Sequence, residues 1–292
     1  MASTRGHHYL VGLVGAGVGP SLTPALHMRE AAQLGIGYLY RTIDLPSLGI
    51  PAEEIGTVLR SARRLGYDAL NITHPCKQLV LAHLDRVHPT AQRLGAVNTV
   101  VFGDDETVGY NTDTTGFATA VRTGVPGAAL GEVVQVGAGG AGAAVADALL
   151  GLGTEHLVIV DLDEARGAAL ARSLAGRFPS ARVESAHPDK LPVLLPGADG
   201  LVHCTPTGMA AHPGLPLDPS LLHASLWVAD IVYRPLETAL LTAARAVGCT
   251  VLDGGHMAVH QAVDAFALIT GVDPDADRML AHLRELAAAE TP

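Results

Sequence analysis

The sequence predicts an α/β fold with two domains, each built around a largely parallel sheet. Short apolar runs alternate along the chain with segments that show the apolar spacing of amphipathic helices, a rhythm typical of parallel βαβ units. Aromatic residues make up only 4% of the chain, so its small aliphatic side chains suit close packing of helices on a sheet. The length of 292 residues is enough for two domains of ordinary size.

The part of the chain up to residue 116 contains the elements of one α/β domain. An apolar run near its start leads through a Gly/Pro-rich loop into a helical pattern, and a later strand ends in the polar loop Thr73-His74-Pro75. Two apolar runs on either side of Gly103-Asp104-Asp105 predict a hairpin. The expected strands are 9–14, 38–44, 67–72, 96–102 and 106–110, and the expected helices are 25–34, 53–65 and 79–84.

A second domain begins at about residue 117. Its clearest feature is a βαβ unit of about 30 residues, with a glycine-rich turn between the first strand and the helix. We expect residues 117–255 to form this domain, and the helices from about 256 to 292 to pack back on the first one. The expected strands are 132–136, 156–160, 200–204 and 226–231, and the expected helices are 143–152, 165–174, 238–247, 258–270 and 275–289.

The composition excludes several classes of function. The formal net charge is −10 and no basic cluster exceeds the Arg63-Arg64 pair, so a nucleic-acid or anionic membrane surface is not expected. The three cysteines are far apart, which argues against a disulfide framework or a zinc site. The N-terminal segment lacks the apolar core of a signal peptide and no apolar run reaches about 18 residues, so we expect a cytoplasmic protein.

No metal site is expected. His256 and His260 have the i, i+4 spacing of zinc ligands on a helix, but no third ligand is evident. Cys76 next to Lys77 is interpreted as a small packing residue, because no His–Asp partner for a reactive thiol is suggested.

The glycine-rich turn Gly137-Ala138-Gly139-Gly140-Ala141-Gly142 fits the pattern G-x-G-x-x-G. The first glycine permits a tight turn, the third residue lets backbone amides approach a diphosphate, and the last lets the helix lie close to the strand. The helix N-terminus adds free N–H donors and a partial positive charge. The bare pattern is weak in a chain with 33 glycines, but here a strand precedes it and a helix follows it. The turn therefore predicts a dinucleotide site.

Asp161 ends the second strand of this unit, about 20 residues beyond the glycine-rich turn. A carboxylate there accepts hydrogen bonds from the adenosine ribose hydroxyls of NAD and repels the 2′-phosphate of NADP. Arg166 is the only nearby base, and it could stack on adenine or partly accommodate a phosphate. We expect NAD as the cofactor in preference to NADP.

Two polar segments follow strands and carry candidate acid–base groups. Lys77 lies just beyond the third strand, at the edge where open α/β sheets bind ligands, although spacing alone favours a solvated lysine. Asp113 ends the second segment, and a Lys–Asp ion pair can exchange a proton with a substrate hydroxyl. Rivals for this role, each interpreted as structural or peripheral, are His74, His203, His256 and His260.

Several blocks taken together resemble the shikimate dehydrogenase family over nearly the whole chain. Their joint occurrence in this order is far more specific than any single motif. Besides the glycine-rich turn, the blocks are Gly19-Pro20-Ser21-Leu22-Thr23-Pro24 with His27, Asn71-Ile72-Thr73-His74-Pro75-Cys76-Lys77, Gly95-Ala96-Val97-Asn98-Thr99, residues 109–117, Thr205-Pro206-Thr207-Gly208-Met209, Asp230-Ile231-Val232-Tyr233 with Pro235 and Thr238, and Gly254-Gly255-His256-Met257 with Gln261.

The resemblance implies a role for each matching residue and an active site in the cleft between the domains. Lys77 and Asp113 match the catalytic pair, with Lys77 as the proton acceptor in alcohol oxidation. The residues that match carboxylate contacts are Ser21 and Thr23, and those that match ring-hydroxyl contacts are Thr73, Asn98 and Gln261. The residues that match the wall around the nicotinamide are Thr205, Pro206, Met209, Ile231, Gly254 and Met257.

Two departures from the commoner family pattern resemble the NAD-dependent quinate/shikimate branch. Thr23 replaces a serine, and Asp161-Leu162-Asp163 replaces the Asn-Arg type segment of NADP-dependent members. The resemblance implies oxidation of the small ring carboxylates shikimate or quinate by a monomer or homodimer. The alternatives are a dehydrogenase for an aminated analogue, aminoquinate or aminoshikimate, and a non-catalytic sensor of a ring acid. A sensor is expected to have lost Lys77 or Asp113, and both are present.

Overall fold

The computed structural model describes residues 8–289, which form two compact units. The first unit consists of the chain up to Thr112 and from Gln261 onward, and the second consists of Asp113–His260. Most of the N-terminal segment interpreted above as lacking a signal peptide lies outside the described residues. The assignment of substrate and cofactor binding to separate domains stays a prediction.

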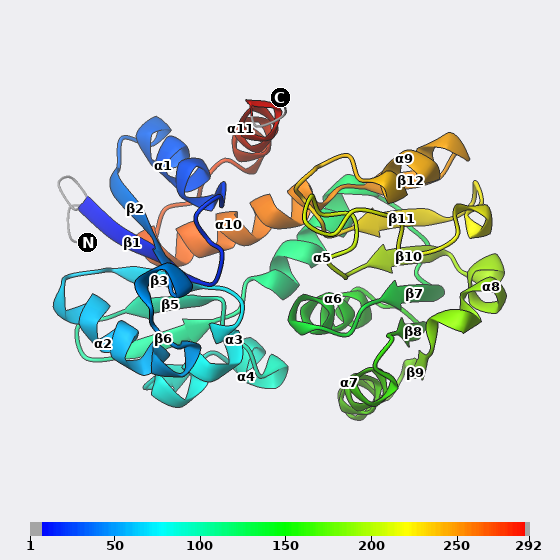
Figure 1. The fold of residues 1–292 in the computed structure, drawn as a ribbon, viewed down its shortest axis with the longest axis horizontal. Helices are drawn as coiled ribbons and strands as arrows, with labels where there is room; N and C mark the ends of the chain where they lie inside the picture. The colour runs from blue at the N-terminus through cyan, green and yellow to red at the C-terminus, as the bar shows by residue number, and fades with distance from the viewer. Residues whose placement is uncertain (1–7, 290–292) are drawn as a thin grey trace. The chain divides into compact units, whose positions relative to one another are not determined.

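The first unit contains a six-stranded mixed sheet in the order β2-β1-β3-β5-β6-β4 (Figure 1). β1, β2 and β3 are parallel, and β5 is antiparallel to both of its neighbours. One face of the sheet packs on α2, and the other packs on α1 and α10. The strands are β1 (His8–Gly15), β2 (Gly37–Asp44), β3 (Ala69–Ile72), β4 (Arg86–Val87), β5 (Thr99–Phe102) and β6 (Thr107–Tyr110).

The helices of the first unit are mostly amphipathic and cover the apolar faces of the sheet. Pro24 lies in the first turn of α1, where the missing proline N–H costs no hydrogen bond. α10 begins in the second unit and ends in the first. The helices are α1 (Thr23–Gln33), α2 (Ile55–Arg64), α3 (Cys76–Leu79), α4 (Pro89–Leu94), α10 (Gly254–Thr270) and α11 (Ala276–Ala289).

The second unit contains a fully parallel six-stranded sheet in the order β12-β11-β10-β7-β8-β9, which is the doubly wound Rossmann order (Figure 1). Except for the outer strand β9, the strands are mostly apolar because helices cover both faces. They are β7 (Glu132–Val136), β8 (His156–Val160), β9 (Arg182–Ala186), β10 (Gly200–His203), β11 (Trp227–Asp230) and β12 (Thr250–Leu252).

Two layers of helices enclose this sheet. Apolar residues of α5, α6 and α7 form one core with the strands, and those of α8 and α9 form the other core on the opposite face. The helices are α5 (Asp113–Gly124), α6 (Gly140–Gly151), α7 (Glu164–Arg177), α8 (Leu191–Leu194) and α9 (Ala239–Ala246).

The predicted α/β class is confirmed, and the predicted strands and long helices lie within a few residues of the observed ones, but some local predictions were wrong. The helix expected at 79–84 is the short α3 followed by a 3₁₀ segment, Val80–His83. The helix after the glycine-rich turn begins at Gly140 and not at residue 143, so half of the turn is already helical. Sequence patterns did not predict α4, α5, α8, β4, β9 or β12. β9 was missed because it is an outer strand without an apolar run.

Candidate functional site

The first unit gathers several expected substrate residues at one edge of its sheet. Thr73 directly follows β3, and its amide donates a hydrogen bond to the carbonyl of Val14 at 2.9 Å. Asn98 directly precedes β5, and its carbonyl accepts from the amide of Ile72 at 2.8 Å. Because β5 runs antiparallel to β3, the start of β5 and the end of β3 bring Thr73 and Asn98 to the same edge.

Lys77 is positioned by the short helix α3 at this edge. The fully buried Cys76 anchors the helix in the core. The carbonyl of Lys77 accepts a hydrogen bond from the amide of Val97 at 2.8 Å, which ties α3 to the segment that carries Asn98. The Lys77 residue is half-buried and not fully solvated. The backbone therefore places the only lysine of this unit beside the polar edge.

The side-chain amide of Asn98 is held in one orientation. Its Oδ1 accepts from the amide of Thr112 at 2.9 Å and from the hydroxyl of Thr99 at 3.1 Å. Its Nδ2 donates to Thr112 Oγ1 at 2.9 Å and to Gln261 Oε1 at 3.4 Å. The Thr112 hydroxyl in turn donates to the carbonyl of Gln261 at 3.0 Å. Asn98 and Gln261, 163 residues apart, are thus brought together.

A second layer of polar side chains, to which the sequence analysis assigned no role, supports Asn98. The Tyr40 hydroxyl donates to Asn71 Oδ1 at 2.6 Å, and Asn71 Nδ2 donates to Thr99 Oγ1 at 2.9 Å. All three side chains are buried, so each polar atom needs its partner. The sequence signal was Asn71 inside the otherwise apolar strand β3.

Ser21 and Thr23 lie in the loop after β1 and at the start of α1, and both are half-buried. The Ser21 hydroxyl oxygen accepts from the amide of Thr23 at 3.3 Å. Gly15, at the end of β1, packs so closely on Thr73 that a side chain there would overlap it. The loop that carries Ser21 and Thr23 therefore begins at the edge of the sheet where Thr73 lies.

Asp113 is the first residue of α5 and directly follows Thr112 in the chain. It is 3% exposed, so its carboxylate is withdrawn from bulk water. The pairing of Lys77 with Asp113 and the position of the active site in a cleft stay predictions.

The glycine-rich turn of the second unit has the geometry that a dinucleotide needs. Gly137 has φ +108°, and a Cβ there would lie 2.7 Å from the carbonyl oxygen of Cys204. Any side chain at Gly142 would overlap the carbonyl of Gly137. Gly139 and Gly140 face open space, and the 12-residue α6 begins there with first-turn amides that have no acceptor within the helix. These residues fit a diphosphate.

The side chain of Gln135 stabilises the glycine-rich turn, although the sequence patterns did not single it out. Its Nε2 donates to the carbonyls of Gly137 and Gly142, each at 2.9 Å. The side chain is completely buried in β7. A glutamine inside the apolar strand EVVQV was the available signal.

Asp161 lies at the end of β8 with its carboxylate already bonded. Oδ2 accepts from the amide of Ala138 at 2.7 Å, and Oδ1 accepts from the amide of Asp163 at 2.8 Å. Arg166 donates to both oxygens. Burial alone would raise the pKa of Asp161, but the hydrogen bonds from Arg166 and the two amides hold the pKa below its ordinary value. Asp161 is an ionised residue that links the glycine-rich turn to Arg166.

The residues expected around the nicotinamide follow β10 and β11 or begin α10. Thr205 Cγ2 lies within contact distance of the glycine-rich turn, because a Cβ at Gly137 would be 2.9 Å from it. Any side chain at Gly254 would overlap the carbonyls of Ile231 and Val232, so α10 begins directly against the segment after β11. Of the remaining expected residues, Met257 is buried on α10, Pro206 is exposed after Thr205, and Met209 is exposed in the loop that follows β10.

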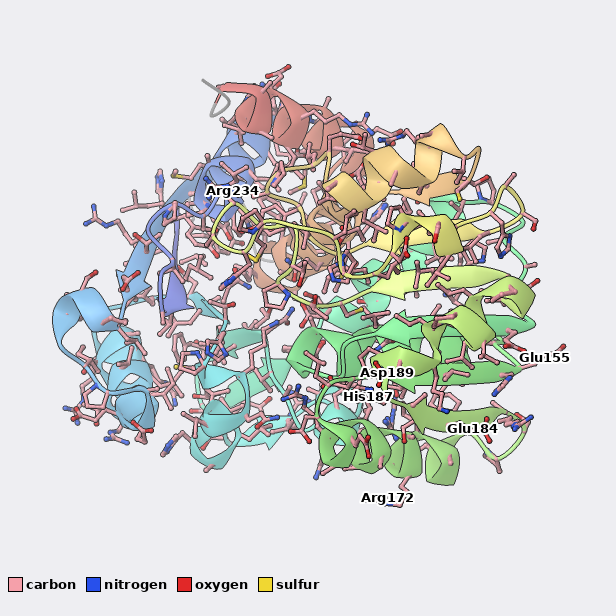
Figure 2. The ribbon with its side chains drawn as sticks, turned by 45° about the vertical axis from the view of Figure 1, so that its right-hand side comes forward. Glu155, Arg172, Glu184, His187, Asp189 and Arg234 are labelled. Carbon is pink, nitrogen blue, oxygen red and sulfur yellow. The ribbon has the colours of Figure 1, made fainter. Side chains whose placement is uncertain are left out.

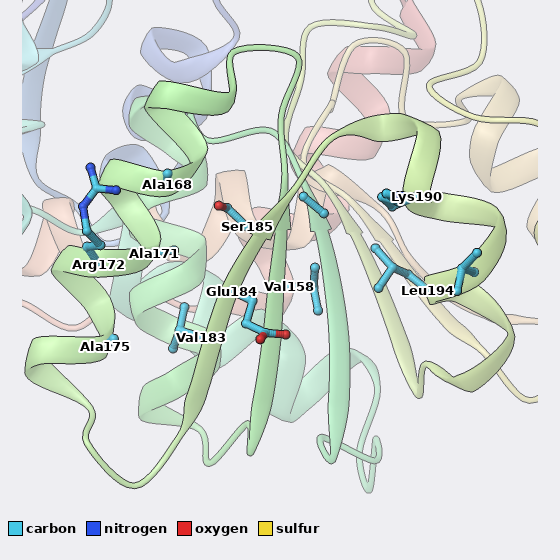
Figure 3. A pocket seen from close by; sticks show the side chains of 12 residues that line it. Val158, Ala168, Ala171, Arg172, Ala175, Val183, Glu184, Ser185, Lys190 and Leu194 are labelled. Atoms are coloured by element: carbon cyan, nitrogen blue, oxygen red, sulfur yellow. The ribbon is translucent and has the colours of Figure 1, made fainter.

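A groove of about 560 Å³ in the second unit is lined by none of these residues (Figure 3). It runs beside the outer strand β9 and is lined by side chains that include Arg172, Glu184 and Lys190. Figure 2 shows Arg172 on α7 and Glu184 on β9. The groove nevertheless adjoins Asp161, because Ala186, which lines it, accepts a hydrogen bond from the amide of Asp161 at 3.2 Å.

Residues 8–289 were compared with the requirements of a metal site and of a membrane-spanning helix. No three His, Cys, Asp or Glu side chains gather there as metal ligands would. His256 instead lies 3.3 Å from Asp253, and His260 lies 3.3 Å from the hydroxyl of Thr123. None of the helices in this range is long and apolar enough to cross a lipid bilayer.

The Rossmann strand order and the glycine-rich turn together define a dinucleotide-binding α/β protein. Comparisons with known proteins narrow this class. Residues 13–100 match the family model described as the shikimate dehydrogenase substrate binding domain. The chain is 62% identical to a "Shikimate dehydrogenase (NADP(+))" of Streptomyces avermitilis, over 96% of both chains. It is 48% identical to a "Quinate/shikimate dehydrogenase (NAD(+))" of Corynebacterium efficiens, over 95% of this chain and 98% of the relative.

The fold leads to the same group of proteins. The solved structure "Quinate dehydrogenase from Corynebacterium glutamicum in complex with NAD" superposes with a TM-score of 0.89 at 45% identity, over 95% of this chain and 99% of that one. The chain therefore belongs to the shikimate dehydrogenase family. It is an oxidoreductase that acts on CH–OH groups with a nicotinamide dinucleotide.

Proposed function

We propose that this protein catalyses the reversible oxidation of shikimate, quinate or both to the 3-dehydro acids, with NAD preferred to NADP. The observation that carries this proposal is the polar edge of the first unit, where Thr73, Lys77 and the fixed amide of Asn98 gather. Hydroxyl, amide and ammonium groups in one place suit a small polyhydroxylated acid. The proposal includes a cytoplasmic enzyme that works as a monomer or homodimer.

The first unit would bind the ring acid, and its Lys77, with Asp113 as the first residue of the second unit, would move the proton. Ser21 and Thr23 would donate hydrogen bonds to its carboxylate, and Asn98 and Gln261 would contact ring hydroxyls. Lys77 Nζ would accept the proton of the hydroxyl at the reacting carbon, and Asp113 would orient the amine. When bound, the nicotinamide dinucleotide supplies the hydride acceptor. The second unit would hold the diphosphate at α6 and the adenosine ribose near Asp161.

The preference for NAD rests on the buried negative charge of Asp161 beside the glycine-rich turn. A 2′-phosphate placed against this carboxylate would be repelled. One observation instead favours NADP. The guanidinium of the half-exposed Arg166 lies at the same place as Asp161 and can bind a phosphate. The relatives carry both names, NADP(+) at 62% identity and NAD(+) at 48%.

The test is a two-by-two comparison of kcat/KM for shikimate and quinate with NAD and NADP. Turnover of either acid supports the dehydrogenase, and a larger kcat/KM with NAD supports the cofactor preference. A folded protein that is inert with both acids contradicts the proposal. Aminoquinate and aminoshikimate are added to identify the aminated alternative, and binding of a ring acid without turnover identifies a sensor.

A further inference from the structure

Two buried side chains of the second unit, His203 and Asp230, form a pair that the proposed chemistry does not use. They are the last residues of β10 and β11 and lie opposite each other in the sheet. His203 Nδ1 is 2.9 Å from Asp230 Oδ1, and the residues are 0% and 2% exposed. Such a buried polar pair persists only where its hydrogen bonds are satisfied.

The other partners of Asp230 fix the position of the histidine proton. Asp230 Oδ1 also accepts from the amide of Val232 at 3.0 Å, and Oδ2 accepts from the hydroxyl of Thr238 at 2.8 Å. A carboxylate can only accept, so His203 Nδ1 carries a proton and donates it to Asp230, and in the neutral ring Nε2 offers a lone pair. The hydroxyl of Thr205, 2.5 Å from Nε2, is then the donor. The chain of bonds runs from Asp230 through His203 to Thr205.

Thr205 lies where this sheet should bind its ligand. From β7 the chain continues to β8 on one side, and β10 lies on the other, so the strand order reverses between β7 and β10. Ligands of open α/β sheets bind in the crevice at that reversal. Thr205 contacts the glycine-rich turn across it, and its Oγ1 also accepts from the amide of Thr207 at 3.3 Å.

We infer that His203 and Asp230 are positioning residues for the dinucleotide, acting through the hydroxyl of Thr205. They hold Thr205 and Thr207 as the wall of the crevice on the β10 side. The adenosine half belongs to the β8 side, where Asp161 lies, so the wall on the β10 side faces the nicotinamide half. The inference rests on the proposed function in that it assumes a bound nicotinamide dinucleotide.

Isosteric substitutions separate the two bonds of the histidine. In His203→Asn the amide group takes the place of Nδ1 and keeps only the bond to Asp230, whereas in His203→Gln the amide reaches the place of Nε2 and keeps only the bond to Thr205. Thr205→Val removes the hydroxyl and keeps the shape, and Thr205→Ser keeps the hydroxyl. The matched control is Asp147→Asn, which alters another buried carboxylate of this unit, paired with Arg177 at 2.5 Å between α6 and α7.

The readouts are the unfolding temperature and the dissociation constants for NADH, NADPH and ADP-ribose. ADP-ribose is NADH without its nicotinamide, and relative to NADPH it also lacks the 2′-phosphate, so each ligand is compared between variant and wild type. We expect His203→Asn and Thr205→Val to weaken binding of the preferred reduced dinucleotide about tenfold and that of ADP-ribose less than about twofold. Thr205→Ser stays within about twofold of the wild type, and His203→Gln is weakened less than His203→Asn. The double variant His203→Asn/Thr205→Val is no weaker than either single variant, because both remove the same bond.

Asp147→Asn is expected to lower the unfolding temperature and leave the dissociation constants for NADH, NADPH and ADP-ribose unchanged. Equal weakening of dinucleotide and ADP-ribose, or a lower unfolding temperature with no change in binding, would show that the pair is only structural. Additive effects in the double variant would show that His203 does not act through Thr205. If the wild-type protein binds neither NADH nor NADPH, the proposed function fails and this inference fails with it. If it binds them and the variants bind equally well, only this inference fails.

Discussion

Arg166 and Asp161 form an ion pair with two hydrogen bonds at the end of β8. Arg166 Nη2 is 2.7 Å from Asp161 Oδ1, and Nε is 3.3 Å from Oδ2. The aspartate side chain is 5% exposed and the arginine side chain 52% exposed. The negative charge is therefore fixed by the fold, while the positive charge faces solvent and can change partner. The choice between the two dinucleotides depends on which of the two charges the ribose meets.

Replacement of Arg166 by Ala should separate the two cofactors. With NADP, the variant loses a charge-assisted hydrogen bond worth about 2 kcal/mol, so kcat/KM should fall about 30-fold. With NAD, kcat/KM should change by less than about threefold, because the released carboxylate of Asp161 can accept from the ribose hydroxyls. The measurement is kcat/KM for each cofactor at a saturating ring acid.

Arg172→Ala is the matched control, because Arg172 is exposed on the same helix, α7, and its replacement by Ala removes the same charge. Both cofactors should behave with this variant as they do with the wild type. An equal loss with NAD and NADP in Arg166→Ala would contradict the assignment of Arg166 to the 2′-phosphate.

Lys77→Ala should lower turnover of shikimate or quinate by about 10²-fold or more, because the proposed proton acceptor for the reacting hydroxyl is removed. The dissociation constant for NADH should stay within about twofold of the wild-type value. The chain has only one other lysine, Lys190, which is exposed in the second unit, so Lys190→Ala is the control. Unchanged turnover in Lys77→Ala would mean that another group moves the proton.

Features that depend on local chemistry could be predicted from the sequence. The glycine-rich turn requires particular residues at fixed spacing, and the structure has Gly137 at positive φ and Gly142 packed on a carbonyl. The buried strands β7 and β8 were predicted with their observed limits, because they are mostly apolar runs between clear breaks. β9 has no such run, because a strand at the edge of a sheet need not be apolar.

Features that depend on register and side-chain geometry could not be predicted. His203 and Asp230 are 27 residues apart, and only the parallel pairing of β10 with β11 places them opposite each other. The sequence suggested Asp161 as an acceptor for the ribose and Arg166 as a nearby group for adenine or a phosphate. The structure shows instead that Arg166, in the first turn of α7, donates to both carboxylate oxygens of Asp161.

The link between α1 and α11 should depend on one buried ion pair. Glu30 is fully buried and accepts from Arg278 Nε at 2.8 Å and from Arg278 Nη2 at 2.5 Å. Arg278→Ala leaves this carboxylate with the amide of Asp275 and no cation, so the free energy of unfolding should fall by about 3 kcal/mol. The measurement is urea unfolding of the full chain.

A second ion pair joins the same two helices and serves as the comparison. Arg29 and Glu285 are 40% and 62% exposed, so Arg29→Ala should cost less than about 1 kcal/mol. If both variants lost the same amount, burial of Glu30 would not be the cause of the larger effect.

His27 should make the first unit less stable as the pH falls. It is completely buried among Tyr38, Tyr40 and Phe266, and burial lowers its pKa to about 3 from an ordinary value of 6.5. The folded state keeps the ring neutral, whereas the unfolded state binds a proton below pH 6.5. Stability from this group is therefore complete above pH 6.5 and is lost, by about 1.4 kcal/mol per pH unit, as the pH falls toward 3.

The variant His27→Leu has no group that titrates at this position, so this loss of stability is absent from it. Between pH 7.5 and 5.5 the free energy of unfolding of the wild type should therefore fall by about 1.4 kcal/mol more than that of the variant, as measured by urea unfolding at each pH. Equal slopes for the two proteins would show that His27 takes up its proton without unfolding.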